Sequence, residues 1–234
     1  MKPALIQCRG LLVGYEGRAV LPPIDVDVRA GSFVVVAGRN GSGKSTWFRT
    51  VLGLLPPVGG SLVRADGVRP TYMPQRMRFD DLTPVTVAQV VAMGTLRGWS
   101  FLRPGGGAQA AAAMERLGIT SLAGRTFRSL SEGQKQKVLL ARIVASGANI
   151  ALLDEPTAAM DHAAERETLE VLASLHRELG LAVVVVSHHL AAAVPFATDA
   201  IFFDPDAGQV VAGSAREVFR HPAFLARHGE LHLG

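Results

Sequence analysis

The stretch SFVVVAGRNGSGKSTWFRT, residues 32–50, predicts the central architecture of this chain. It begins with a continuous apolar run, which is typical of a strand buried on both faces of a mainly parallel sheet. A glycine-rich turn follows, and the next residues predict a helix that ends near Leu55, before Pro56 and Pro57. A strand, a tight turn and a helix in this order indicate an α/β fold.

The turn itself, GRNGSGKST, fits the P-loop pattern in full, including the strand before it and the helix after it. Its glycines let the backbone curl so that successive N–H groups and the helix N-terminus face a phosphate. Lys44 is expected to reach the β- and γ-phosphates, and Ser45 to hold Mg²⁺. An ordinary strand-to-helix turn would not need a lysine and a serine at these positions. The predicted nucleotide contacts are Gly38, Arg39, Asn40, Gly41, Ser42, Gly43, Lys44, Ser45 and Thr46.

A second buried run, IALLDEP at residues 150–156, ends in two carboxylates. Asp154 falls at the carboxyl end of the strand, where open parallel sheets bind their ligands, and suits a metal-facing role beside the P-loop. Glu155 could accept a proton from an attacking water. The alternative, a pair of solvated acids at a strand end, is less consistent with the neighbouring P-loop. These features together predict a nucleoside triphosphatase.

The rest of the chain supports one α/β domain over residues 1–234. The first 35 or so residues alternate and turn like a small antiparallel layer, and helical patterns occupy about 77–148, with a loop at 98–107. Strand patterns return at 150–156 and 181–189 around a helix at 162–180, and a hairpin is expected at 200–213. We therefore predict a P-loop NTPase core with a mainly parallel sheet, an N-terminal antiparallel β subdomain and an inserted α-helical subdomain. The core and its β layer would comprise 1–76 and 149–234, and the helical subdomain 77–148.

The composition of the chain indicates which cellular compartment and which kinds of binding partner to expect. The single cysteine, Cys8, rules out an internal disulfide and favours the reducing cytosol. The first residues lack the apolar core of a signal peptide, and no run approaches the roughly 18 apolar residues of a membrane span. The net charge is +4, but the basic residues are scattered, which favours a solvated surface over a nucleic-acid interface.

The stretch SLSEGQKQKVLLAR, residues 129–142, contains an unusual helix start. Ser131 and Gln134 have the spacing of a capping box, in which each side chain bonds the other residue's backbone N–H. Gly133 lies inside that first turn, although glycine weakens a helix by about 1 kcal/mol relative to alanine. Its presence there suggests a purpose other than helix stability.

Five motifs in order give the chain a specific resemblance. LSEGQ, at residues 130–134, is similar to the LSGGQ signature of ATP-binding cassette (ABC) transporters, and Gln75, Asp161 and His188 match the Q-loop, D-loop and switch histidine. Tyr15 matches the aromatic residue that stacks on adenine. Each alone would be an ordinary loop or surface residue, but together they cover most of the chain. The sequence resembles the nucleotide-binding subunit of an ABC transporter.

The resemblance implies a mechanism. In this family two subunits pack head to tail around two ATP molecules. Ser131, Gly133 and Gln134 would contact the γ-phosphate bound by the partner's Lys44. Glu155 would be the general base and His188 would touch the γ-phosphate. Gln75 would link the nucleotide and Mg²⁺ to the membrane partner, so that the metal-associated residues are Ser45, Gln75 and Asp154, while Asp161 joins the nucleotide-contacting set.

The sequence departs from the family pattern at three places. Glu132 replaces the first glycine of the signature, the D-loop reads AAMD, and His189 stands where an aspartate often follows the histidine. None removes a group with an assigned catalytic role.

The absence of a membrane span implies separate permease subunits, with this chain at the inner face of the cell membrane. The stretch YMPQRMRFDDLTPVTVAQVVAMGTLRG, residues 72–98, is similar to subunits of zinc, manganese and iron importers. A metal importer with a substrate-binding protein is therefore expected. The alternatives are export of another substrate or a non-transport ABC ATPase in DNA repair, translation or assembly. An inactive regulatory module is disfavoured because the catalytic residues are present.

Three C-terminal histidines, His221, His228 and His232, do not have the spacing of a compact metal site. A solvated tail is the expectation for this segment.

Overall fold

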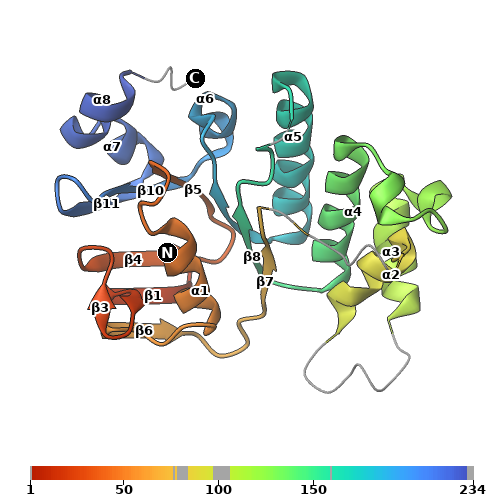
Figure 1. The fold of residues 1–234 in the computed structure, drawn as a ribbon, viewed down its shortest axis with the longest axis horizontal. Helices are drawn as coiled ribbons and strands as arrows, with labels where there is room; N and C mark the ends of the chain where they lie inside the picture. The colour runs from red at the N-terminus through yellow and green to blue at the C-terminus, as the bar shows by residue number, and fades with distance from the viewer. Residues whose placement is uncertain (1, 76, 78–83, 97–105, 159, 231–234) are drawn as a thin grey trace.

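The computed structural model of the chain describes residues 2–75, 77, 84–96, 106–158 and 160–230 (Figure 1). The strands are β1 (Ala4–Leu12), β2 (Gly14–Tyr15), β3 (Arg18–Ala19), β4 (Ile24–Arg29), β5 (Phe33–Gly38), β6 (Gly59–Arg64), β7 (Pro70–Met73), β8 (Ile150–Asp154), β9 (Ala182–Val186), β10 (Asp199–Asp204) and β11 (Gln209–Ser214). The α-helices are α1 (Lys44–Leu52), α2 (Val87–Ala92), α3 (Gly107–Arg116), α4 (Glu132–Ala145), α5 (His162–Leu179), α6 (Leu190–Ala193), α7 (Ala215–Phe219) and α8 (Pro222–His228). The loop expected at 98–107 lies almost wholly outside the described residues.

The central sheet has six strands in the order β11-β10-β5-β9-β8-β7. Only the β10–β11 pair, the expected hairpin, is antiparallel. Every residue of β5, β8 and β9 is buried, as their continuous apolar runs predicted. The α/β fold class with a mainly parallel sheet is confirmed.

Alternate side chains of the central strands pack on opposite faces of the sheet. On one face, Val34 and Val36 of β5 join Trp47 and Phe48 of α1 and the apolar residues of the antiparallel sheet. On the other face, Phe33 belongs to a larger core with side chains of α2 to α7. The P-loop helix is therefore held between the two sheets.

The three-stranded antiparallel sheet has the order β4-β1-β6, and its strand β6 was not among the strands predicted from the sequence. β6 lies outside the expected layer of the first 35 residues. Its side chains are exposed or only partly buried, and two glycines begin it, so neither the apolar alternation nor the β-branched content of a strand is present. Pairing with β1, and not the local pattern, forms this strand.

The helices α2, α3 and α4 pack on one another at one end of the molecule (Figure 1). The core of this group includes Val90, Ala113 and Leu139. α4 also contacts α5 and β7, which connects the helical group to the central sheet. The subdomain boundaries near 76–77 and 148–149 remain a prediction.

Two details differ from expectation. α1 ends at Leu52, not near Leu55, because Gly53 adopts a left-handed conformation with φ 79° and its N–H bonds the carbonyls of Arg49 and Thr50. The C-terminal segment is not simply a tail, because it forms α8. His221 accepts a hydrogen bond from the N–H of Ala223 at the start of that helix.

His228, at the end of α8, stacks on Phe224 with ring centroids 4.7 Å apart. His232 lies outside the described residues. Within the described ranges, no helix is long and apolar enough to cross a membrane.

Candidate active site

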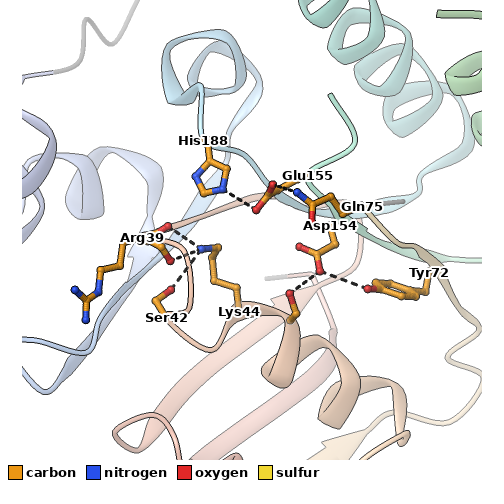
Figure 2. Close-up of polar contacts among 10 residues, drawn as sticks. Arg39, Ser42, Lys44, Tyr72, Gln75, Asp154, Glu155 and His188 are labelled. Carbon is orange, nitrogen blue, oxygen red and sulfur yellow. Dashed lines mark hydrogen bonds and ion pairs between the residues drawn. The ribbon is translucent and has the colours of Figure 1, made fainter. Parts of the chain in front are cut away.

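The candidate site lies at the carboxyl ends of three neighbouring strands. β9 pairs with β5 on one side and β8 on the other, and Val186 aligns with both Val36 and Asp154. The segments that follow these strands therefore meet at one edge of the sheet, where α/β proteins bind ligands. Figure 2 shows the polar side chains gathered there.

The P-loop backbone depends on glycine at its two ends. Gly38 has φ 146°, and a Cβ there would lie 2.8 Å from the carbonyl oxygen of Phe203. Gly43 has φ 85° at the N-cap of α1, and a Cβ there would lie 2.7 Å from Leu21. No side chain caps this helix N-terminus. Its N–H groups are therefore available to an anion, which the helix dipole also favours.

The Lys44 ammonium group lies inside the loop that precedes it. It donates hydrogen bonds to the carbonyl oxygens of Gly38 and Arg39, both at 2.7 Å, and lies 3.4 Å from the Ser42 hydroxyl (Figure 2). Burial lowers the pKa of Lys44, and the nearby charges of Glu155 and Asp154 oppose that shift. A bound phosphate would stabilise the charged form in the same way as these carboxylates.

Ser45 and Asp154 form an oxygen-rich pair, with the serine hydroxyl donating to the carboxylate at 2.6 Å. A hydroxyl and a carboxylate at this separation suit Mg²⁺, which prefers oxygen ligands. The Tyr72 hydroxyl donates a longer bond of 3.4 Å to the same carboxylate oxygen. Burial, followed by the charge of Asp154, raises the pKa of Tyr72 to about 12, so the phenol stays protonated. No sequence pattern indicated a role for Tyr72, although it lies three residues before Gln75 in YMPQ.

Glu155 is held from two sides. Gln75 Nε2 donates to one carboxylate oxygen at 2.5 Å, and His188 Nε2 lies 2.6 Å from the other (Figure 2). The residue has φ 49°, a backbone conformation that non-glycine residues seldom adopt and that occurs preferentially at functional sites. The structure thus brings three predicted catalytic residues into direct contact.

Tyr15 lies beside the first turn of α1, the helix that follows the P-loop turn. Its ring is partly exposed, and its hydroxyl is 3.3 Å from that of Thr46. Figure 2 shows the Arg39 guanidinium pointing away from Lys44. It pairs with Asp206 at 2.7 Å. Of the P-loop side chains predicted to contact nucleotide, that of Arg39 is therefore directed elsewhere, although its backbone remains in the loop.

The start of α4 forms the predicted capping box. Ser131 accepts from the Gln134 N–H, and Gln134 accepts from the Ser131 N–H. A Cβ on Gly133 would meet nothing within 4 Å. Among the contacts of the described residues, none joins this helix start to the P-loop of the same chain. Asp161 likewise caps a helix, accepting from the Ala164 N–H at the start of α5.

One further polar group beside the site, Glu165, was not predicted from the sequence. Glu165 is buried on α5, and it contacts both the Thr157 hydroxyl and the His189 ring. The one sequence signal near this group is His189, which stands where an aspartate often follows the switch histidine in the ABC pattern. Position 165 carries no such signal, because a glutamate in the first turns of a helix is common.

Comparison with known proteins assigns the family. The profile of the ABC transporter family matches residues 21–158. The zinc import ATP-binding protein ZnuC of Ruegeria pomeroyi is 39% identical over 190 residues, covering 81% of this chain and 71% of the relative. The ZnuC protein of Yersinia pestis is 34% identical over 98% of this chain and 87% of its own length.

Solved structures agree with the sequence relatives. An inward-facing metal-chelate type ABC transporter has a chain 27% identical to this one, with a TM-score of 0.84 over 96% of this chain and 88% of that one. The fold also matches cbiO1 of Clostridium perfringens at 22% identity, with a TM-score of 0.75 over 97% and 94% of the two chains. A non-transport ATPase is not favoured by these likenesses. The chain belongs to the ABC transporter family, as an ATPase subunit that powers transport.

Proposed function

We propose that this chain drives the import of a metal ion, zinc first among the candidates, through separate permease subunits. A substrate-binding protein would deliver the ion to those subunits. The ion is inferred from relatives that are named zinc import proteins. The proposed location of the chain is the inner face of the cell membrane, where cytosolic ATP is available.

The proposed ATP hydrolysis is supported by one observation above all, the contact of Glu155 with both Gln75 and His188 beside the P-loop. In the proposed reaction a water oxygen bonds to the γ-phosphorus, and the bond from that phosphorus to the β–γ bridging oxygen breaks. Glu155 accepts the proton of the water, and ADP and phosphate leave. Lys44 exchanges its bonds to the loop carbonyls for bonds to the phosphates.

Mg²⁺ would neutralise charge on the phosphate oxygens. Ser45 and Asp154 would hold it, with Gln75 close to Glu155 on the same side of the site. Tyr72 would keep the Asp154 carboxylate oriented through its hydroxyl. Tyr15 would cover the adenine, and Asp161 would approach the phosphates of the neighbouring subunit.

The proposed working unit is a head-to-tail dimer. Ser131, Gly133 and Gln134 would contact the γ-phosphate bound by the partner subunit. A helix N-terminus offers free N–H groups and a partial positive charge to such an anion. Gly133 fits this role, since its missing side chain leaves open space in the single chain.

The substitution Glu155→Gln tests the catalytic assignment, because an amide cannot accept the proton. Purified variant should lose at least about 100-fold in ATP turnover, the scale of a general-base contribution, while ATP still binds and a dimer accumulates in size-exclusion chromatography. The matched control is Glu115→Gln, at an exposed position on α3, which should hydrolyse ATP like the unaltered chain. Normal turnover in Glu155→Gln would contradict the assignment.

The transported ion needs a separate measurement in the organism that makes the protein. Cells carrying only Glu155→Gln should take up less labelled zinc and should grow poorly under zinc chelation, with growth restored by added zinc. Unchanged zinc uptake together with reduced manganese or iron uptake would reassign the ion. Unchanged uptake of all three would reject metal import while leaving the ATPase assignment intact.

A further inference from the structure

Three side chains beside the active site form a cluster that the proposed reaction does not use. They are His162, Glu165 and His189, and one ligand atom from each lies within 4.8 Å of the others. The His189 Nδ1 atom is 2.8 Å from Glu165 Oε2, and the His162 Nδ1 atom is 3.9 Å from the same oxygen. The two imidazole rings have centroids 5.3 Å apart.

The fold makes this cluster from two segments that are distant in sequence. His162 and Glu165 lie on the first turn of α5 with the i, i+3 spacing that places side chains on one face of a helix. His189 follows β9 and precedes α6, which packs against α5. The three residues line one hollow at the surface.

Burial and hydrogen bonding make the carboxylate a fixed member of the cluster. The Glu165 side chain is only 2% exposed, and its other oxygen, Oε1, accepts a hydrogen bond of 2.9 Å from Thr157. The two histidine side chains are 89% and 53% exposed, so an ion can enter from solvent. A carboxylate oriented by a neighbour and flanked by accessible imidazoles is a common arrangement in metal sites.

We propose that His162, Glu165 and His189 bind one divalent transition metal ion of the zinc class. Two imidazole nitrogens and one carboxylate oxygen are a known three-ligand set for zinc, with water in the fourth position. Tetrahedral bonds of about 2.0–2.1 Å place neighbouring ligand atoms about 3.3 Å apart. The two observed separations from Glu165 Oε2, 2.8 and 3.9 Å, lie on either side of that value.

The position of the site suggests what occupancy would do. His162 directly follows Asp161, and His189 directly follows His188, so one ion would link the segments that carry two predicted nucleotide-site residues. Glu165 adds a connection through Thr157 to the segment after Glu155. The ion would therefore restrain the motion of these segments relative to each other. This site is separate from the proposed transport function, and it does not depend on which ion is imported.

The test is a titration of the full-length, tag-free chain with zinc chloride, in competition with a coloured zinc indicator. Nucleotide is left out because ATP itself binds zinc. The unaltered chain should bind one zinc ion per molecule with a higher affinity than it shows for any additional zinc ions. In His162→Ala and in His189→Ala the zinc affinity should fall by at least about tenfold. Loss of a residue that only orients a metal ligand already lowers metal affinity by about 10- to 100-fold, so loss of a ligand itself should cost at least as much.

The matched control is His221→Asn, which removes a histidine outside the cluster and keeps a residue able to cap α8. It should bind zinc like the unaltered chain. Because His162 is almost fully exposed, His162→Ala should fold normally, which circular dichroism can verify. A chain that binds no such ion, or binds it equally well after both histidines of the cluster are replaced, would overturn the proposal.

Discussion

Gly133 is a residue whose identity the packing of the single chain does not explain. It lies in the first turn of α4, and a Cβ there would meet nothing within 4 Å. Gly133→Ala should therefore raise the free energy of unfolding by about 0.5–1 kcal/mol through helix propensity. If a partner's phosphate approaches this backbone, the same substitution should lower ATP turnover. Urea unfolding and a phosphate-release assay measure the two effects.

Gly107 provides the matched comparison. It is also a first-turn glycine with open space around its Cβ direction, but it begins α3. Gly107→Ala should be equally stabilising and should leave ATP turnover unchanged. Full activity in Gly133→Ala would show that no phosphate needs the room at that position.

Cys8 should be chemically inert in the folded chain. It is fully buried, and burial raises the pKa of its thiol to about 11 from the ordinary value of 9.0. At pH 8 the thiolate fraction is then about 100-fold lower than in an unfolded chain, since each pKa unit is a factor of ten. Iodoacetamide labelling followed by mass spectrometry should detect slow modification in buffer and rapid modification in urea. Equal rates would contradict the burial.

The same shift has a defined effect on stability. Because the folded state resists ionisation of Cys8, its contribution to the free energy of unfolding is complete below pH 9 and is lost as the pH rises toward about 11. Cys8→Ala should show a smaller decline over that interval. Unfolding curves at pH 8 and pH 10.5 for both proteins provide the comparison.

Asp161, at the start of α5, has one observed role and one predicted role. Asp161 caps the helix by accepting the Ala164 N–H at 2.9 Å, and it is also the residue predicted to act near the phosphates. Asp161→Ala should lower the free energy of unfolding by about 1 kcal/mol, whereas Asp161→Asn should preserve most of it, since asparagine caps equally well. Thermal unfolding of the two variants measures the cap.

ATP turnover then separates the second role from the first. If the carboxylate acts at the nucleotide, Asp161→Asn should be slower than the unaltered chain despite its normal stability. Ser214→Ala serves as a control, because it removes the capping box of α7 without touching the candidate site. Equal turnover of Asp161→Asn and the unaltered chain would leave Asp161 as a helix cap only.

In the described part of the chain, no contact joins the P-loop to the start of α4, the helix start predicted to face a partner's phosphate. Lys44 lies in the P-loop at the sheet edge, whereas Ser131 begins a helix of the α2–α4 group (Figure 1). A head-to-tail dimer would join the P-loop of one copy to the helix start of the other. Mixing Lys44→Ala with Ser131→Arg should therefore create one intact site in each mixed dimer.

Random mixing makes half of the dimers mixed, each with one intact site of two, so about a quarter of the original ATP turnover is expected. Each variant alone should be inactive. The measurement is steady-state ATP hydrolysis at constant total protein after joint refolding or co-expression. A mixture no more active than its components would contradict sites shared between subunits.

Much of this architecture follows from local patterns. The apolar runs of β5, β8 and β9 predicted buried parallel strands, because only strands covered on both faces are apolar throughout. The capping box of Ser131 and Gln134 was predicted from spacing, because its bonds lie within one helical turn. The end of α1 at Leu52 was missed, although Gly53 was a local signal for it.

Other features depended on contacts between distant segments. β6 becomes a strand because β1 pairs with it, and its own residues do not show a strand pattern. Tyr72 bonds Asp154 across 82 positions of sequence, and His189 meets Glu165 across 24. Periodicity and motif spacing report the interactions of neighbouring residues, so the P-loop, the buried strands β5, β8 and β9 and the capping box of α4 were predictable. The contacts around Glu155 and the His162–Glu165–His189 cluster were not, because they exist only where the fold brings separate strand ends and helix starts together.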